Sequence, residues 1–200
     1  VRSRCIEERV RQLPLLSVTD ERLPTGADRW RAYVVITFIG QGYVWRDINC
    51  PRHVVPANIA VPWLEISRRL DMPPVVSYST ACLYNWGLRD PSGPFNGDNL
   101  YSLITYTGLT DESWFYVVSL LVEVAAVPAL KAVLGAYESI KQRDNGALLE
   151  CMGVMTGALK NMTNALKEMT KERCDPVKFY EEIRQFQKGS SDDLLKERNG

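Results

Sequence analysis

Residues 114–134 read WFYVVSLLVEVAAVPALKAVL, and this stretch decides how the rest of the chain is interpreted. Only Ser119, Glu123 and Lys131 interrupt it with strong polarity, and Pro128 lies in its second half. A helix that is apolar nearly all round is normally buried in a protein core or in a membrane. The uninterrupted apolar runs are shorter than the roughly 18 residues of a membrane span, and a glutamate at mid-membrane costs about 2.5 kcal/mol or more. We therefore predict a buried core helix.

The composition is that of an ordinary globular protein, with 46% hydrophobic and 24% charged residues among 200. The 24 lysines and arginines balance the 24 aspartates and glutamates, so no bulk charge favours nucleic acid or anionic lipid. The five cysteines are widely spaced, and neither a zinc site nor a disulfide framework is indicated. No secretory signal opens the sequence, so we expect a cytoplasmic protein with reduced thiols that binds neither nucleic acid nor membrane.

Apolar periodicity along the chain predicts an all-α fold. Loops are expected at residues 20–28 and 49–62, and helices at 4–16, 30–43, 63–70, 112–142, 148–170 and 177–187, with a further buried segment at 75–86. Thr110 or Asp111 is expected to cap the helix over residues 112–142. The β-branched content of residues 30–43 would also permit a strand. A kink is expected near Pro128.

The turn-rich segment RDPSGPFNGDN at residues 89–99 is the best candidate for a boundary. We expect a small helical domain over residues 1–108 and the beginning of a larger helical domain over residues 109–200. In the larger domain, the leucine and methionine stripe of residues 148–170 is interpreted as core packing.

Few side chains offer recognisable chemistry. His53 is the one histidine, and a surface position in its proline-bounded loop is favoured over a metal-ligating or general-base role. The sequence contains no glycine-rich phosphate loop and no nucleophile elbow. Ser119 and Glu123 are four residues apart and share one helix face. A serine in an apolar helix usually donates to the carbonyl four residues earlier, so the spacing alone favours a structural role over a functional one.

Several stretches together resemble the indoleamine 2,3-dioxygenase family. They are PANIAVPWLEISRRLDMPPVVSYSTACLYNW at residues 56–86 and FYVVSLLVEVAAVPALK at residues 115–131, with LPLLSVTDERL and GYVWR upstream in the same order. The resemblance implies an all-helical protein in which a small and a large domain sandwich haem b, with its iron. It also implies an enzyme that inserts both atoms of O2 across the C2–C3 bond of tryptophan or a related indole. The product is N-formylkynurenine, the first intermediate of the kynurenine pathway.

The same resemblance implies which residues form the site. Ser119 matches the family's distal serine near haem and substrate, and Phe115 matches the aromatic residue that stacks near the indole. The implied pocket wall also contains Tyr78, Ala81, Cys82 and Tyr116, with Val118, Leu121 and Val122 as its apolar surface. The family pattern has a cysteine at the position of Ala81, an aliphatic residue at Cys82 and a phenylalanine at Tyr116, which leaves the preferred indole open.

The family's proximal haem histidine and its substrate-contacting loop phenylalanine and arginine have no counterpart in these 200 residues. His53 does not match the proximal site. The resemblance therefore implies an incomplete chain whose iron ligand lies beyond Gly200. The alternative hypothesis is a non-catalytic helical remnant that binds no haem and acts at most as an interaction module. A monomer is expected.

Overall fold

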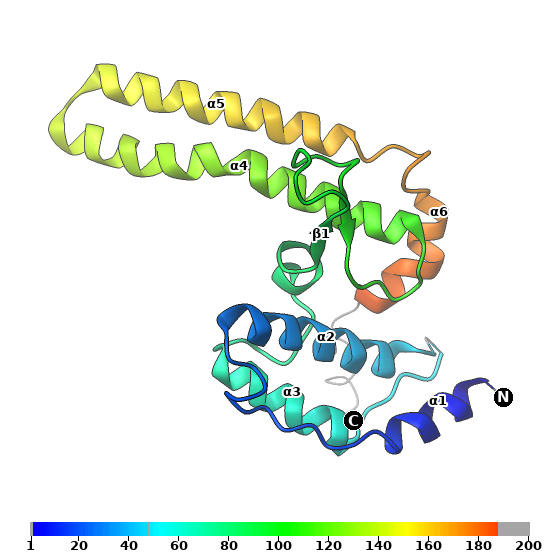
Figure 1. The fold of residues 1–200 in the computed structure, drawn as a ribbon. Coiled ribbons are helices and arrows are strands. Elements are labelled where there is room, and N and C mark those ends of the chain that lie inside the picture. The colour runs from blue at the N-terminus through cyan, green and yellow to red at the C-terminus, as the bar shows by residue number, and fades with distance from the viewer. Residues whose placement is uncertain (1, 48, 188–200) are drawn as a thin grey trace, which may run out of the picture. The chain divides into compact units, whose positions relative to one another are not determined.

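The computed structural model describes residues 2–47 and 49–187, and the side chains from Glu7 onward (Figure 1). Its elements are α1 (Arg2–Arg11), α2 (Gly26–Trp45), α3 (Ala57–Arg69), a π-helical turn (Ser79–Leu83), β1 (Trp86–Leu88), β2 (Leu100–Ser102), α4 (Thr110–Gln142), α5 (Asn145–Lys167) and α6 (Pro176–Lys178). α6 leads directly into helical turns over Phe179–Ile183 and Arg184–Gln187. The predicted helical fold is confirmed, and among the described residues the antiparallel pair β1–β2 is the only sheet.

The chain divides into two compact units. The first contains Val1–Asn85, Leu103–Gly108 and Val177–Gly200, and the second contains Trp86–Ser102 and Leu109–Pro176. The predicted division into a small domain over residues 1–108 and the beginning of a larger one over residues 109–200 stays a prediction. The expectations for residues 188–200 lie outside the described part of the chain.

A capping box starts α2 in the first unit. The N–H of Asp28 donates to the Thr25 hydroxyl at 3.1 Å, and the N–H of Thr25 donates to the Asp28 carboxylate at 3.1 Å. These bonds satisfy two of the N–H groups that a helix start leaves without partners. The hydrogen bonds from Thr25 also hold the pKa of Asp28 below its usual range. The helix therefore begins at Gly26. The loop predicted for residues 20–28 ends earlier than expected, because residues 26–28 belong to α2.

α3 begins at Ala57, well before the predicted start at residue 63. Ile59, Pro62, Trp63 and Ile66 are buried, and their i, i+3, i+4, i+7 spacing places them on one helix face. Pro62 lies inside the helix, where it removes one N–H donor. The buried stripe shows why the helix persists despite this loss. The sequence prediction took Pro62 as the first helical residue, and it therefore missed the helical turn that begins at Ala57.

The indole of Trp63 joins α3 to α2. Its Nε1 donates to the Oγ1 of Thr37 at 2.9 Å, and Thr37 is fully buried. A Cβ atom at position 40 would fall only 2.7 Å from the Trp63 Cε3 atom. The close approach of the ring therefore requires a glycine at this point of α2.

An aromatic stack brings distant segments into the first unit. The ring of Tyr106 lies between those of Phe38 and Phe186, with 4.7 Å between centroids on each side. The side-chain amide of Gln41 also donates to the backbone carbonyl of Phe186 at 3.0 Å. The predicted helical run over residues 177–187 is confirmed, and these contacts fix it against α2.

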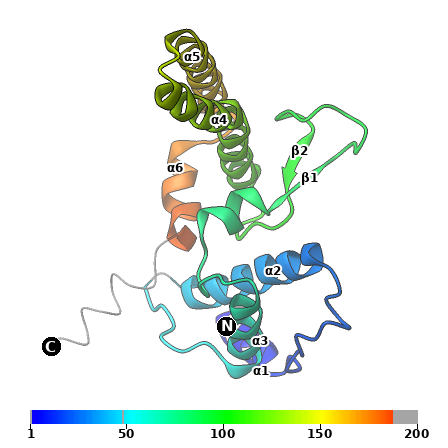
Figure 2. The same ribbon diagram turned by 90° about the vertical axis from the view of Figure 1, so that its left-hand side faces the viewer.

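α4 and α5 form a long antiparallel pair in the second unit (Figures 1 and 2). Asp144 caps α5 by accepting from the N–H of Ala147 at 3.0 Å. Small side chains are buried in the helix pair, namely Ala132, Ala136 and Ser139 of α4 and Ala158 of α5. A Cβ on Gly135 would fall 3.0 Å from the Sγ of Cys151, so the two backbones approach closely here.

The prediction that residues 114–134 form a buried core helix is correct only for the first turns. Tyr116, Val117, Val118 and Leu120 are buried, whereas Leu130, Val133 and Leu134 are exposed. Among the described helices, α4 is the one with the length and composition that could also cross a membrane, with 22% of its most apolar window buried. The absence of a membrane partner stays a prediction. α4 continues through Pro128 without a break.

The stripe predicted to be core packing in residues 148–170 is likewise only half covered. Met155, Met162 and Met169 are partly buried, whereas Leu149, Met152, Leu159 and Leu166 are exposed. Apolar periodicity reports which residues share a helix face, but not whether another element covers that face. The prediction was therefore wrong for the exposed residues.

Candidate functional site

The predicted site residues are divided between the two units. Tyr78, Ala81 and Cys82 belong to the first unit, and Phe115, Tyr116 and Ser119 lie on α4 in the second. The geometry of each group is described within its own unit.

One face of α4 carries a partly accessible apolar line, which we call the α4 stripe: Phe115, Ser119, Val122 and Ala126. All four side chains are half-buried, and their spacing of four, three and four residues places them on one helix face. The hydroxyl of Ser119 donates to the carbonyl of Phe115 at 2.9 Å, as its position in an apolar helix predicts. The hydrogen of the Ser119 hydroxyl is thus engaged by the helix backbone.

Tyr116 supports the ring of Phe115 from within the unit. The two rings meet edge to face, with centroids 5.9 Å apart and planes at 66°. The buried hydroxyl of Tyr116 donates to the Oε1 of Glu112 at 3.1 Å, and Glu112 is fully buried. Burying a polar group without a hydrogen-bond partner is costly, so a partner within the unit stabilises the fold. This hydrogen bond gives a physical reason for a tyrosine at position 116.

The first turns of α4 are anchored on two sides. The N–H of Ser102 in β2 donates to the Ser113 hydroxyl at 2.9 Å. The N–H of Asp175 donates to the carboxylate of Asp111 at 2.9 Å. Burial raises the pKa of the neighbouring Cys174 thiol, and the charges of Asp111 and Asp175 act in the same direction. The α4 stripe therefore begins on a well-fixed part of the helix.

The first-unit group lies on and beside the π-helical turn. Ala81 and Cys82 are buried, whereas the side chain of Tyr78 is 50% exposed. The Oγ1 of Thr80 donates to the carbonyl of Ser77 at 2.7 Å. The side-chain amide of Asn85 donates to the Ala81 carbonyl at 3.2 Å, which holds the end of the turn. Of the predicted residues here, Tyr78 is the one whose side chain reaches the surface of the unit.

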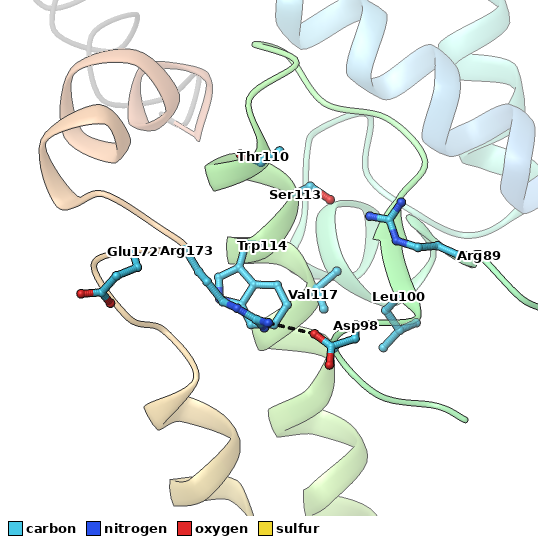
Figure 3. Close-up of a pocket in the computed structure, with 10 residues that line it drawn as sticks. Arg89, Asp98, Leu100, Thr110, Ser113, Trp114, Val117, Glu172 and Arg173 are labelled. Atoms are coloured by element: carbon cyan, nitrogen blue, oxygen red, sulfur yellow. Dashed lines mark hydrogen bonds and ion pairs between the residues drawn. The ribbon is translucent and has the colours of Figure 1, made fainter. Parts of the chain in front are cut away.

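Sequence reasoning missed a pocket of about 330 Å³ in the second unit (Figure 3). It is lined by Arg89, Gly97, Asp98, Leu100, Thr110, Ser113, Trp114, Val117, Glu172 and Arg173. The guanidinium carbon of Arg173 lies 4.1 Å from the centroid of the Trp114 ring, and its Nη2 donates to Asp98 at 2.8 Å. No predicted site residue lines this pocket. The residues that line the pocket are far apart in the sequence. The one feature of the sequence that could have indicated the pocket was Trp114, an aromatic residue near the start of a helix.

Among residues 2–47 and 49–187, no three His, Cys, Asp or Glu side chains gather closely enough to hold a metal ion. His53 is exposed in its loop, and α4 contains neither histidine nor cysteine. The α4 stripe offers the apolar contact that a flat ring system needs, but no axial ligand for iron. The position of the residue that ligates the iron therefore stays a prediction.

A helical protein that presents an aromatic ring, a serine oxygen and small apolar side chains in one line is suited to bind a flat, mainly apolar ligand. The family model described as indoleamine 2,3-dioxygenase matches residues 1–199. The chain belongs to the indoleamine 2,3-dioxygenase family, whose named members are oxidoreductases.

The relatives show how much of the family's length is represented. The chain is 34% identical to indoleamine 2,3-dioxygenase 2 of Mus musculus, over 96% of this chain and 47% of that protein. It is 35% identical to indoleamine 2,3-dioxygenase 1 of Mus musculus, over 92% of this chain and 45% of the relative. It is 32% identical to indoleamine 2,3-dioxygenase of Saccharomyces cerevisiae, over 80% of this chain and 36% of that protein. The chain spans about half the length of the two Mus musculus relatives and about a third of the Saccharomyces cerevisiae one, and the predicted family is confirmed.

Proposed function

We propose that this chain contributes the substrate-side wall of a haem-dependent dioxygenase that oxidises tryptophan or a related indole. The reaction inserts both atoms of O2 across the indole C2–C3 bond and gives N-formylkynurenine. The observation that carries the proposal is the α4 stripe, an accessible aromatic–serine–aliphatic line in a chain whose family is named for indoleamine oxidation. Haem, when bound, would supply the oxygen chemistry, and the α4 stripe would lie on the side of the substrate.

The roles of the stripe residues follow from their chemistry. The half-buried ring of Phe115 offers an aromatic surface to an indole, and aromatic pairs gain energy in edge-to-face or offset arrangements. Val122 and Ala126 extend the apolar line with small side chains. A flat apolar ligand could lie against them and exclude water from this face of the helix. Ser119 would make one hydrogen bond, to the substrate, to a haem propionate or to water. None of these groups is a strong base, so their work is to bind and orient.

The finer assignments remain part of the proposal. Tyr78, Ala81, Cys82 and Tyr116 are assigned to substrate contact by resemblance alone. A cysteine at position 82 instead of 81 is expected to alter which indole the protein prefers. The protein is proposed to act as a cytoplasmic monomer that takes tryptophan and O2.

Replacing Ser119 with alanine is expected to reduce kcat/KM for tryptophan by less than about tenfold, measured on the complete protein with haem. One hydrogen bond to substrate is lost, and a net hydrogen bond is worth about 1 kcal/mol. Ser139→Ala is a matched control, because that serine also donates to a carbonyl four residues earlier, at 2.9 Å, but lies outside the stripe. Ser139→Ala is expected to leave kcat/KM unchanged. If Ser119→Ala abolished turnover while the helix stayed intact, the serine would be an essential proton carrier and the assigned role would be wrong.

A further inference from the structure

Two arginines of the first unit share one carboxylate. The Oε1 of Glu7, on α1, accepts from the Nη2 of Arg46 at the C-terminal end of α2 and from the Nη2 of Arg52 in the loop that follows. The side chain of Arg46 is 8% exposed, whereas those of Glu7 and Arg52 are 22% and 39% exposed. One carboxylate oxygen therefore brings two guanidiniums together at a point that solvent still reaches.

This shared oxygen leaves the two guanidiniums short of acceptors. Within the part of the chain that the structure describes, no group accepts a hydrogen bond from the Nε or Nη1 of Arg46 or from the Nε of Arg52, and all three atoms are buried. A buried donor without an acceptor is costly, and the cost is greater for a charged group. Such donors are rare in folded proteins, so these three need an explanation.

Positive charge is also in local excess here. Burial lowers the pKa of Arg46, and the charge of Arg52 lowers it further, while Asp47 and Cys50 act in the opposite direction. Arg11 adds a third guanidinium, because it lines the same pocket of about 340 Å³ as Arg52. The whole chain has equal numbers of cationic and anionic side chains, 24 of each, so the excess belongs to this place and not to the protein in general.

We propose that a tetrahedral oxyanion, either phosphate or a small phosphate monoester, binds between Arg46 and Arg52 at the position of the Glu7 carboxylate. Guanidinium groups bind phosphate oxygens through pairs of N–H donors. A phosphate monoester carries a charge of about −1.5 to −2 at pH 7 and offers three terminal oxygens, so it can serve the N–H groups that Glu7 leaves without an acceptor.

The displaced carboxylate has another partner. Arg11 lies four residues after Glu7 on α1, the spacing at which a glutamate and a following arginine pair on a helix surface. Glu7 thus competes with the anion and limits its affinity. The inference does not depend on the proposed reaction, because every residue in it belongs to the first unit and none lies on α4.

Isothermal titration calorimetry of the 200-residue chain in Tris buffer at constant ionic strength tests the proposal. The chain is expected to bind one inorganic phosphate with a Kd of about 1 mM or lower. Acetate, with two oxygens and one charge, is expected to bind at least about tenfold more weakly. Glycerol 3-phosphate is titrated in parallel: tighter binding than inorganic phosphate assigns the site to monoesters, weaker binding assigns it to the free anion, and both support the proposal. No binding of either compound, or acetate binding as tightly as phosphate, would overturn it.

Two kinds of variant should move the affinity in opposite directions. Glu7→Gln removes the competing charge and is expected to tighten phosphate binding at least about threefold. Arg46→Gln is expected to weaken it at least about tenfold, and Arg46→Lys, which keeps the charge but loses the planar fork, about fivefold. Arg52→Gln, at a more exposed side chain, is expected to weaken binding as well and carries the test if the Arg46 variants do not fold. Far-UV circular dichroism reports folding.

Arg31→Gln is the matched control. It removes the same charge from an exposed position of α2, about 22 Å along the helix from Arg46, and is expected to change the Kd by less than about twofold. A loss of affinity equal to that of Arg46→Gln would show that phosphate responds to net charge alone. Weaker phosphate binding by a folded Glu7→Gln variant would show that the anion does not take the place of the carboxylate. Either result would overturn the proposal.

Discussion

Replacing Trp63 with alanine is expected to lower the free energy of unfolding by about 3–5 kcal/mol, the usual cost of deleting a buried indole. The ring is 7% exposed and packs between α2 and α3, and its Nε1 bonds to the fully buried Thr37. Truncation therefore leaves a cavity and also a buried hydroxyl without its partner. Urea unfolding followed by far-UV circular dichroism measures the change without relying on the fluorescence of the removed tryptophan.

A double-mutant cycle with Gly40 tests the same packing more sharply. Gly40→Ala alone is expected to cost about 1–3 kcal/mol, because the new Cβ overlaps the Trp63 ring. In the Trp63→Ala background the same change is expected to be neutral or stabilising by up to about 1 kcal/mol, since alanine favours a helix interior. Gly153→Ala in α5, where a Cβ meets no atom within 4 Å, should stabilise in both backgrounds. Additive costs for Gly40 and Trp63 would contradict the close approach of ring and glycine.

Replacing Phe115 with alanine is expected to lower kcat/KM for tryptophan by about 10- to 100-fold in the complete protein with haem. The loss of the aromatic contact to the indole removes about 1–3 kcal/mol of binding free energy. The contact is expected in both the bound substrate and the transition state, so its loss lowers kcat/KM. Because the ring is half-buried, the structural cost is smaller than that of a core aromatic. Steady-state turnover gives the kinetic change, and thermal unfolding gives the stability change.

Phe95→Ala is the matched control for Phe115→Ala. Phe95 is 41% exposed, lies in the same unit, and also meets a neighbouring ring edge to face, that of Trp86 at 5.1 Å. Its truncation removes the same number of atoms outside the α4 stripe and is expected to leave kcat/KM unchanged. Equal kinetic losses in the two variants would show that Phe115 acts through general stability and not through contact with the indole.

The helical elements were largely predictable from the sequence because helix-forming signals are local. The apolar period of residues 30–43 lies within the helix that it predicts, α2. The start of α5 at Asn145, three residues before the predicted residue 148, was missed. The early start of α3 was not predicted, because Pro62 is common at the first position of a helix and was given that place. Only the burial of Ile59 together with Trp63 shows that the helix extends before it.

The candidate site was predictable in part, for a related reason. The Ser119 hydrogen bond follows from the local rule for serine in an apolar helix, and the structure confirms it. The bond from Tyr116 to Glu112 joins residues one turn apart, but its significance depends on burial that the sequence does not show. The contact of Arg173 with Trp114 depends on the chain path between them. The exposure of Leu130 and Leu134 could not be foreseen either, because apolarity alone does not reveal what covers a helix.

Oxidation of L-tryptophan under ¹⁸O2 by the complete protein, loaded with ferrous haem, tests the central claim most directly. Mass spectrometry of the product reports both the identity of the compound and the source of its oxygen atoms. The account predicts N-formylkynurenine that carries two ¹⁸O atoms, with a strongly reduced yield from the Phe115→Ala variant. A folded, haem-loaded protein that forms no product, or a product that carries a single ¹⁸O atom, would contradict the assignment.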